Sequence, residues 1–230
     1  MEALPRQGGV TVPTSWVVGE RHGRAGELHH RQPPDDTGRT ADWLVVDRPA
    51  IVLGSAQRDG EIDVEACVAS GVEVARRRSG GGAVLMVPGE MLWLDVVVPR
   101  DDPLWDDDIG RAMWWLGDVW AEALTASGVD GVEVHRGPVQ HTPWSRRVCF
   151  DGVGAGEVLV HGAKAVGVSQ RRTRHWLRLQ SSVHQVWRGD LMGSCLSAPQ
   201  PVADELRSPW CWPGDPDVLV ATVQSSLRSR

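Results

Sequence analysis

The chain has 230 residues, of which 41% are hydrophobic, and its formal net charge is −6. A chain of this length can bury one full core, so we expect a single domain over residues 1–230, and the acidic balance argues against a nucleic-acid partner. No segment approaches the roughly 18 consecutive apolar residues of a membrane span, and the N-terminus does not resemble a signal peptide. These features predict a cytoplasmic protein with no membrane partner.

Cysteine and histidine patterns give no sign of a metal site. The four cysteines, at 67, 149, 195 and 211, form no CxxC pair, which predicts reduced thiols rather than a zinc site or a disulfide framework. Among eight histidines only His29 and His30 are adjacent, and adjacent side chains rarely converge on one ion. We therefore expect no bound metal held by protein side chains.

The N-terminal third predicts loops followed by strands. Residues 1–12 and 31–40 are rich in proline, glycine and charge, which predicts a loose terminus and a surface loop. The apolar runs at 43–46 and 51–53 have strand length and are separated by a proline-containing turn. They predict two strands that pair with each other.

A short helix and two further strands surround a glycine-rich segment. Asp63 is a suitable N-cap for a helix that ends before Gly71, and Gly71 can adopt a left-handed conformation there. Strands are predicted at 72–75 and 91–98, the second with alternate apolar residues on one face. Gly80–Gly82 then lie between these two strands.

The second half alternates between helices and a hairpin. Apolar residues at helical spacing predict an amphipathic helix over 109–124, with its buried face beginning at Ile109. Segments 157–160 and 163–167 predict a hairpin that turns at His161-Gly162, which places Lys164 just after the turn. Asp215, followed by proline, predicts the start of a last helix, so the whole pattern favours an α+β fold.

Three successive glycines, Gly80, Gly81 and Gly82, are costly in backbone entropy and contribute no side chain to a core. They permit a ligand to approach main-chain N–H groups, and Arg76–Arg78 could supply charge for a phosphate or carboxylate. The alternative is a glycine-rich turn beside a solvated basic patch. The spacing matches neither a Walker A motif nor a GxGxxG fingerprint.

The order of residues in this segment is informative. Residues 76–84, RRRSGGGAV, resemble the loop that members of the lipoate-protein ligase A family wrap around the lipoyl chain and its adenylate. The resemblance implies that lipoyl-AMP is contacted by the following residues: Arg77, Ser79, Gly80, Gly81, Gly82 and Ala83. The family usually continues with an aromatic residue, His and Asp, whereas residues 85–90 here read LMVPGE.

A second segment, residues 164–172 with the sequence KAVGVSQRR, resembles the family signature whose lysine is the central catalytic residue. The resemblance implies catalysis by Lys164 and substrate contacts from Gly167, Ser169 and Arg171, with Ser169 in place of the usual alanine. A fixed ammonium can neutralise charge at an attacked α-phosphate or acyl carbonyl. Without these neighbours, Lys164 would be interpreted as a solvated surface residue. The family's following His-Gly pair is replaced here within QSSV, residues 180–183.

The implied fold is that of biotin and lipoate ligase catalytic domains, with mixed β-sheets flanked by helices. Because the chain ends at Arg230 after a single predicted helix, we expect no separate C-terminal accessory domain. The implied activity uses ATP and Mg²⁺ to convert lipoate to lipoyl-AMP and then transfers the lipoyl group to a lysine of a carrier domain. The implied partners are lipoyl-domain carrier proteins, either 2-oxoacid dehydrogenase E2 subunits or the glycine cleavage H protein.

Two alternatives remain open. Related octanoyltransferases need no ATP and use a cysteine to take octanoyl from acyl carrier protein; Cys149, in the segment VCFD, resembles that cysteine. A thiol near the Lys164 cation could become a competent nucleophile, although a free cysteine is more often a small buried hydrophobe. The other alternative is a non-catalytic module that binds lipoate or lipoyl domains, suggested by the altered residues after Val84 and at Gln180.

Overall fold

The computed structural model describes residues 15–202 and 205–230, so the predicted loose terminus at 1–12 lies outside the described residues. Within these described residues, ten strands form two sheets. The seven-stranded sheet contains, in spatial order, β1 (Val17–Gly23), β2 (Thr40–Val46), β6 (Met91–Pro99), β10 (Trp176–His184), β9 (Ala163–Arg172), β8 (Val158–Val160) and β7 (Val132–Val134). The three-stranded sheet contains β4 (Glu73–Arg76), β3 (Ala50–Leu53) and β5 (Val84–Met86).

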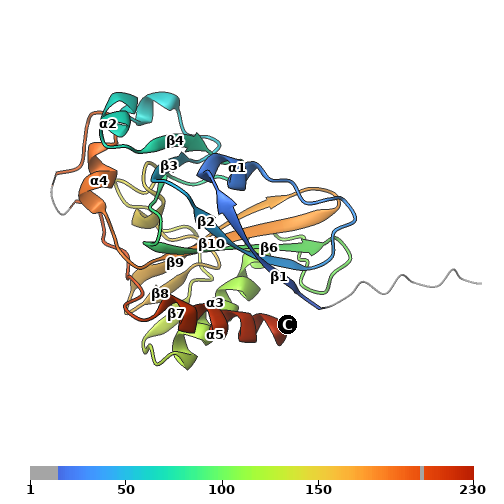
Figure 1. The fold of residues 1–230 in the computed structure, drawn as a ribbon. Helices are drawn as coiled ribbons and strands as arrows, with labels where there is room; N and C mark the ends of the chain where they lie inside the picture. Colours follow the sequence, from blue (N-terminus) through green and yellow to red (C-terminus); the bar gives the residue numbers. More distant parts are fainter. Residues whose placement is uncertain (1–14, 203–204) are drawn as a thin grey trace, which may run out of the picture.

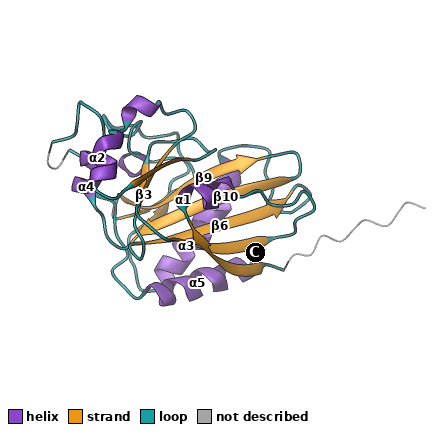
Figure 2. Ribbon diagram, turned by 45° about the horizontal axis from the view of Figure 1, so that its top comes forward, coloured by secondary structure: helices purple, strands orange, loops and turns teal. Residues whose placement is uncertain are grey.

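In the part of the chain that the structure describes, α-helices flank these sheets (Figures 1 and 2). They are α1 (Ala25–His30), α2 (Val64–Ala69), α3 (Trp114–Ala126), α4 (Gly189–Ser194) and α5 (Pro216–Arg228). Short 3₁₀ turns occur at Asp59–Glu61, Arg111–Met113 and Cys149–Asp151. The mixed sheets and flanking helices confirm the predicted α+β class.

Alternation along β6 divides the interior into two layers. Leu94, Val96 and Val98 point towards α3 and α5 and belong to the largest buried cluster. Trp93, on the opposite face, packs with residues of α1 and of the small sheet. This is the period-two pattern expected of a strand buried on both sides. The large sheet is therefore covered by α3 and α5 on one face and by α1 with the small sheet on the other.

Several local predictions are confirmed. The Asp63 carboxylate accepts a hydrogen bond from the Ala66 N–H at 2.9 Å and caps α2, and Gly71 has φ of +69°. His161 and Gly162 both have positive φ, at 50° and 80°, and form the turn between β8 and β9. Asp215 caps α5, with Pro216 in its first turn.

Three predictions about elements are wrong. The segments at 43–46 and 51–53 do not pair: β2 lies in the large sheet and β3 is the centre of the small one, because the turn between them crosses from one sheet to the other. The helix starts at Trp114, so Ile109 precedes it and is 65% exposed. β5 intervenes between the glycines and β6. An apolar run identifies a buried strand but not its partner.

Candidate active site

The glycine loop, which connects β4 to β5, lies against the segment that carries Cys149. The Ala83 N–H donates to the Arg147 carbonyl at 2.7 Å, and the Cys149 N–H donates to the Ala83 carbonyl at 2.9 Å. A side chain at Gly82 would place its Cβ 2.7 Å from the carbonyl carbon of Val148, closer than real Cβ atoms approach. Gly82 is therefore required by this backbone contact, whereas Gly80 has open space around it.

Arg77 holds the glycine loop in shape. Its guanidinium is buried and donates to the carbonyls of Val52 at 3.0 Å, Gly80 at 2.7 Å and Gly82 at 2.8 Å. Burial lowers the pKa of Arg77, and the neighbouring Cys149 opposes that shift. The structure thus places Arg77 behind the loop, where its guanidinium binds three main-chain carbonyls and also adjoins Cys149.

Lys164 is buried at the start of β9 and uses its ammonium group within the protein. Its Nζ donates to the carbonyls of Cys149 at 2.9 Å and Gly152 at 3.0 Å, and it lies 2.7 Å from Oε2 of Glu157. Burial alone favours the neutral amine, but the Glu157 carboxylate raises the pKa of Lys164 above its ordinary value. Lys164 is therefore a fixed cation, and it is hydrogen-bonded to the main chain of Cys149.

Glu157 is a site residue that the sequence analysis missed. It precedes β8, and the β8–β9 hairpin brings it to Lys164. Its Oε2 also accepts from the Gly154 N–H at 2.7 Å, and its Oε1 accepts from the Val168 N–H at 3.2 Å. The predicted turn at His161-Gly162 was the available signal, because a hairpin places residues on either side of its turn close together.

Cys149 lies where two cavities meet. A cavity of about 550 Å³ is lined by Gly80–Gly82, Glu157 and Lys164, and a narrow pocket of about 40 Å³ is lined by apolar side chains that include Met86, Trp93 and Phe150. Both are lined by Cys149, Val168 and Ser169. The thiol therefore borders a space large enough for a small ligand and a narrow apolar recess.

Most residues predicted from the two signatures line these spaces. Gly80, Gly81, Gly82, Cys149, Lys164 and Ser169 line the large cavity, and Arg77 and Gly167 line the narrow pocket. The Ser79 hydroxyl donates to the Ser169 hydroxyl at 3.2 Å, which ties the glycine loop to β9. Arg171 lies to the side with Arg78, and its Nη1 has no hydrogen-bond partner among the described residues. Ala83 is buried and contributes through its main chain.

The carboxylates near the large cavity are already engaged. Glu157 is bound to Lys164, and Glu61 accepts from the Gln57 side-chain amide at 2.8 Å and from the Arg58 N–H at 3.2 Å. Over residues 15–202 and 205–230, no group of three or more His, Cys, Asp or Glu side chains is arranged to hold a metal ion. Any Mg²⁺ in this cavity would depend mainly on oxygens of a bound substrate.

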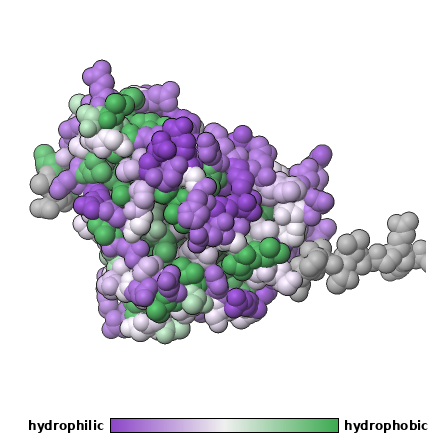
Figure 3. Space-filling view, in the orientation of Figure 1, coloured by the Kyte–Doolittle hydropathy of each residue, from purple (hydrophilic) through white to green (hydrophobic). Residues whose placement is uncertain are grey.

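None of the helices in the described part of the chain is long and apolar enough to cross a membrane. Figure 3 shows the apolar residues of one face as separate patches among larger hydrophilic areas.

Comparison with known proteins matches residues 28–203 to the family described as the lipoyl protein ligase A/B catalytic domain. The chain is similar to octanoyltransferase LipM of Moorella thermoacetica, with 30% identity over 75% of this chain and 62% of that protein. Matches to three such octanoyltransferases cover between 41% and 62% of their lengths, so the chain spans about half the length of the curated relatives it matches.

Solved structures share the fold at low sequence identity. A lipoate-protein ligase A bound with ATP has a TM-score of 0.67 at 17% identity, and the match covers 89% of this chain and 77% of that one. A bi-partite lipoate protein ligase with its E2 lipoyl domain, from Thermoplasma acidophilum, has a TM-score of 0.65 at 13% identity, covering 92% and 82%. These similarities confirm the predicted ligase-like catalytic fold.

Proposed function

Since this chain belongs to the lipoyl protein ligase A/B catalytic domain family, we propose that it transfers a medium-chain acyl group to a carrier-protein lysine through a thioester on Cys149. The observation that carries this proposal is the position of Cys149 at the junction of the large cavity and the narrow apolar pocket. An acyl chain whose far end enters the narrow pocket could place its carbonyl at the thiol. The large cavity would then admit first the donor and later the acceptor.

The proposed reaction has two acyl-transfer steps. The Cys149 sulfur attacks the carbonyl of an acyl thioester on acyl carrier protein and forms a new S–C bond; the S–C bond to the carrier breaks, and the proton of the Cys149 thiol passes to the departing carrier sulfur. The acceptor lysine, as a neutral amine, then attacks the Cys149 thioester and forms an amide; the Cys149 S–C bond breaks, and a proton of the amine passes to the sulfur and regenerates the thiol. Lys164 and Arg77 are buried cations of the described residues that adjoin Cys149, and their charge can stabilise the negative charge that develops on the attacked carbonyl.

A second candidate is the ATP-dependent lipoate ligase. The unbroken Gly80–Gly82 run and the 550 Å³ cavity support it, because they leave room for a ligand larger than an acyl chain. In that reaction, lipoate, ATP and Mg²⁺ form lipoyl-AMP before transfer. Lys164 would have to exchange one of its three protein partners for a phosphate oxygen. The acceptors in both reactions would be the lipoyl domains of E2 subunits or the H protein.

The test measures the intact mass of a lipoyl-domain acceptor. The chain is incubated either with octanoyl-acyl carrier protein or with ATP, Mg²⁺ and free lipoate. We expect acylation from the carrier without ATP, an acylated enzyme intermediate, and loss of both in Cys149→Ser. Cys211→Ser, which changes a half-buried cysteine outside both cavities, serves as the matched control and should remain active.

Each other outcome decides between the alternatives. Acylation that requires ATP and persists in Cys149→Ser would reject the thioester route and support the ligase. Binding of lipoate without acylation under either condition would support a non-catalytic module. Lys164→Ala should abolish transfer by either route.

A further inference from the structure

We propose that Gln180 and His29 form a hydrogen-bonding specificity element in the narrow pocket, which selects acyl chains carrying a sulfur or oxygen acceptor over plain alkyl chains. This inference rests on the proposed acyl transfer and concerns which chain is transferred. Both residues line the narrow pocket beside Cys149. The Gln180 Oε1 lies 3.0 Å from Nδ1 of His29, while the Gln180 Nε2 is buried and has no partner among the described residues.

The contact between the Gln180 Oε1 and Nδ1 of His29 indicates which tautomer His29 adopts. Burial, followed by the charge of Arg77, lowers the pKa of His29 to about 3, so its imidazole is neutral at physiological pH. A neutral imidazole that carries its proton on Nδ1 donates to the Gln180 oxygen. The amide Nε2 is then the group left to donate to a ligand in the pocket.

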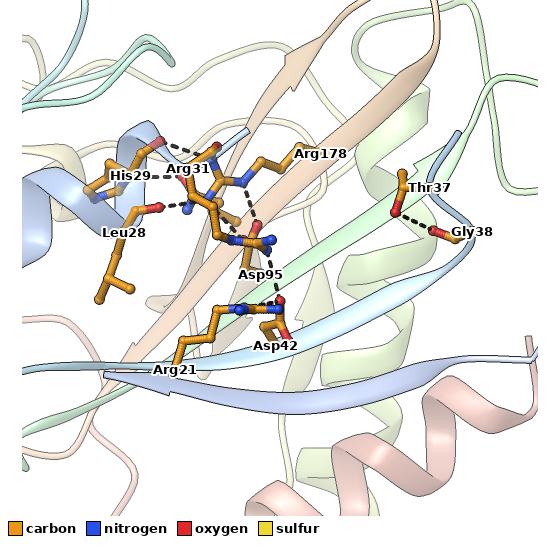
Figure 4. A network of polar contacts seen from close by, with 10 residues as sticks. Arg21, Leu28, His29, Arg31, Thr37, Gly38, Asp42, Asp95 and Arg178 are labelled. Carbon is orange, nitrogen blue, oxygen red and sulfur yellow. Dashed lines mark hydrogen bonds and ion pairs between the residues drawn. The ribbon is translucent and has the colours of Figure 1, made fainter. Parts of the chain in front are cut away.

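His29 is held firmly in place. Its ring packs on Trp93 with the centroids 4.4 Å apart. Arg178, which reaches across from β10, donates to the carbonyls of Leu28, His29 and Arg31 and so fixes the end of α1 (Figure 4). The pair therefore does not depend on a flexible loop.

Arg178 is itself fixed by a buried carboxylate. Its Nε and Nη2 donate to the two oxygens of Asp95 at 2.7 and 2.9 Å. Arg31 also donates to Asp95, at 3.0 Å, and to Asp42, at 2.8 Å (Figure 4). This network joins β2, β6 and β10. Through Arg178, it fixes the main chain of His29 relative to the large sheet.

An unpaired donor in an apolar recess favours a ligand that supplies an acceptor. The recess of about 40 Å³ can hold a water molecule in the free protein. A plain octanoyl chain that displaces this water cannot accept a hydrogen bond from the Gln180 amide. A hydroxyl oxygen can accept that bond, and so can a dithiolane sulfur, which is a weaker acceptor. A net hydrogen bond of ordinary strength corresponds to a preference of about five-fold.

The experiment compares kcat/KM for lipoyl, 8-hydroxyoctanoyl and octanoyl donors. We expect the wild type to prefer the two acceptor-bearing chains over octanoyl by about five-fold. Gln180→Leu keeps a similar volume without the donor, and should bring kcat/KM for the three donors to within about two-fold of one another. His29→Phe should weaken the preference, because the amide loses the partner that orients it. Gln224→Leu, on α5 and outside the pocket, is the matched control and should keep it.

Failure of this inference is distinguishable from failure of the proposed transfer. Equal kcat/KM for the three donors, or a preference unchanged in Gln180→Leu, would overturn the specificity element while transfer itself stands. If no donor is used, the dissociation constants of free lipoate, 8-hydroxyoctanoate and octanoate, measured by calorimetry, provide the same comparison. Tighter octanoate binding to the wild type would then overturn the inference.

Discussion

The Lys164–Glu157 ion pair allows structure and catalysis to be separated experimentally. Lys164→Met removes the ammonium and keeps a chain of similar length, leaving the Glu157 side chain, 5% exposed, without its cation. Breaking a buried pair by removing one partner costs about 3–5 kcal/mol. The carbonyls of Cys149 and Gly152 also lose a donor, but Glu157 keeps two backbone N–H donors and can take up a proton. We therefore expect a loss near 4 kcal/mol in the free energy of unfolding.

The double variant Lys164→Met/Glu157→Gln should recover about half of this loss, because a neutral amide no longer carries an unpaired charge. Urea unfolding followed by tryptophan fluorescence measures stability, and mass spectrometry of the acceptor measures transfer. We expect both variants to be inactive despite their different stabilities. Arg188→Met, which removes an exposed partner of Glu90, controls for loss of a surface charge and should change stability little. Wild-type stability in Lys164→Met, or no recovery in the double variant, would refute the reasoning.

Burial lowers the pKa of His29 to about 3 and of His184 to about 4, with a further contribution from the nearby cations Arg77 and Lys164 respectively. Below pH 6.5 these histidines bind protons in the unfolded chain but not in the folded chain. Lowering the pH from 7.5 to 5.5 should therefore decrease the free energy of unfolding by about 1.4 kcal/mol per histidine. Urea midpoints at pH 7.5 and 5.5 check this; His184→Gln should reduce the difference, and an equal difference in that variant would contradict it. Gly82→Ala should displace the Cys149 segment and abolish transfer, because its Cβ meets the Val148 backbone, whereas Gly80→Ala meets nothing within 4 Å and should retain activity. Similar activity of the two glycine variants would show that the close backbone contact is unimportant.

Local sequence signals predicted local structure well. The cap at Asp63 and the turn at His161-Gly162 depend on backbone chemistry within a few residues, and both are found in the structure. The two family signatures, each continuous in sequence, pointed to the glycine loop and Lys164, and the structure places both beside the same cavity. The predicted hairpin could also have indicated the partner of Lys164, because Glu157 is the first residue of that hairpin and Lys164 lies on its second strand.

Features that depend on pairing between distant strands were not predictable in this way. The segment at Gln180 was interpreted only as a departure from the family pattern, whereas the sheet places it beside His29, a residue far away in sequence. The predicted pairing of 43–46 with 51–53 failed for the same reason, because apolar composition does not encode which sheet a strand joins. Arg77 shows the limit of motif matching: the motif located it, but its contacts are with main-chain carbonyls.

The centre of the large sheet also constrains how the protein reaches its native state. β6 pairs with β10 from Met91↔His184 to Pro99↔Trp176, and the chain between these strands contains both Cys149 and Lys164. Closing so long a loop carries an entropic cost, and topologies dominated by such distant contacts fold slowly. The Cys149 segment also pairs with Ala83 of the glycine loop, which precedes β6, so recovery of acyl transfer after dilution from denaturant should lag behind the formation of α3 and α5.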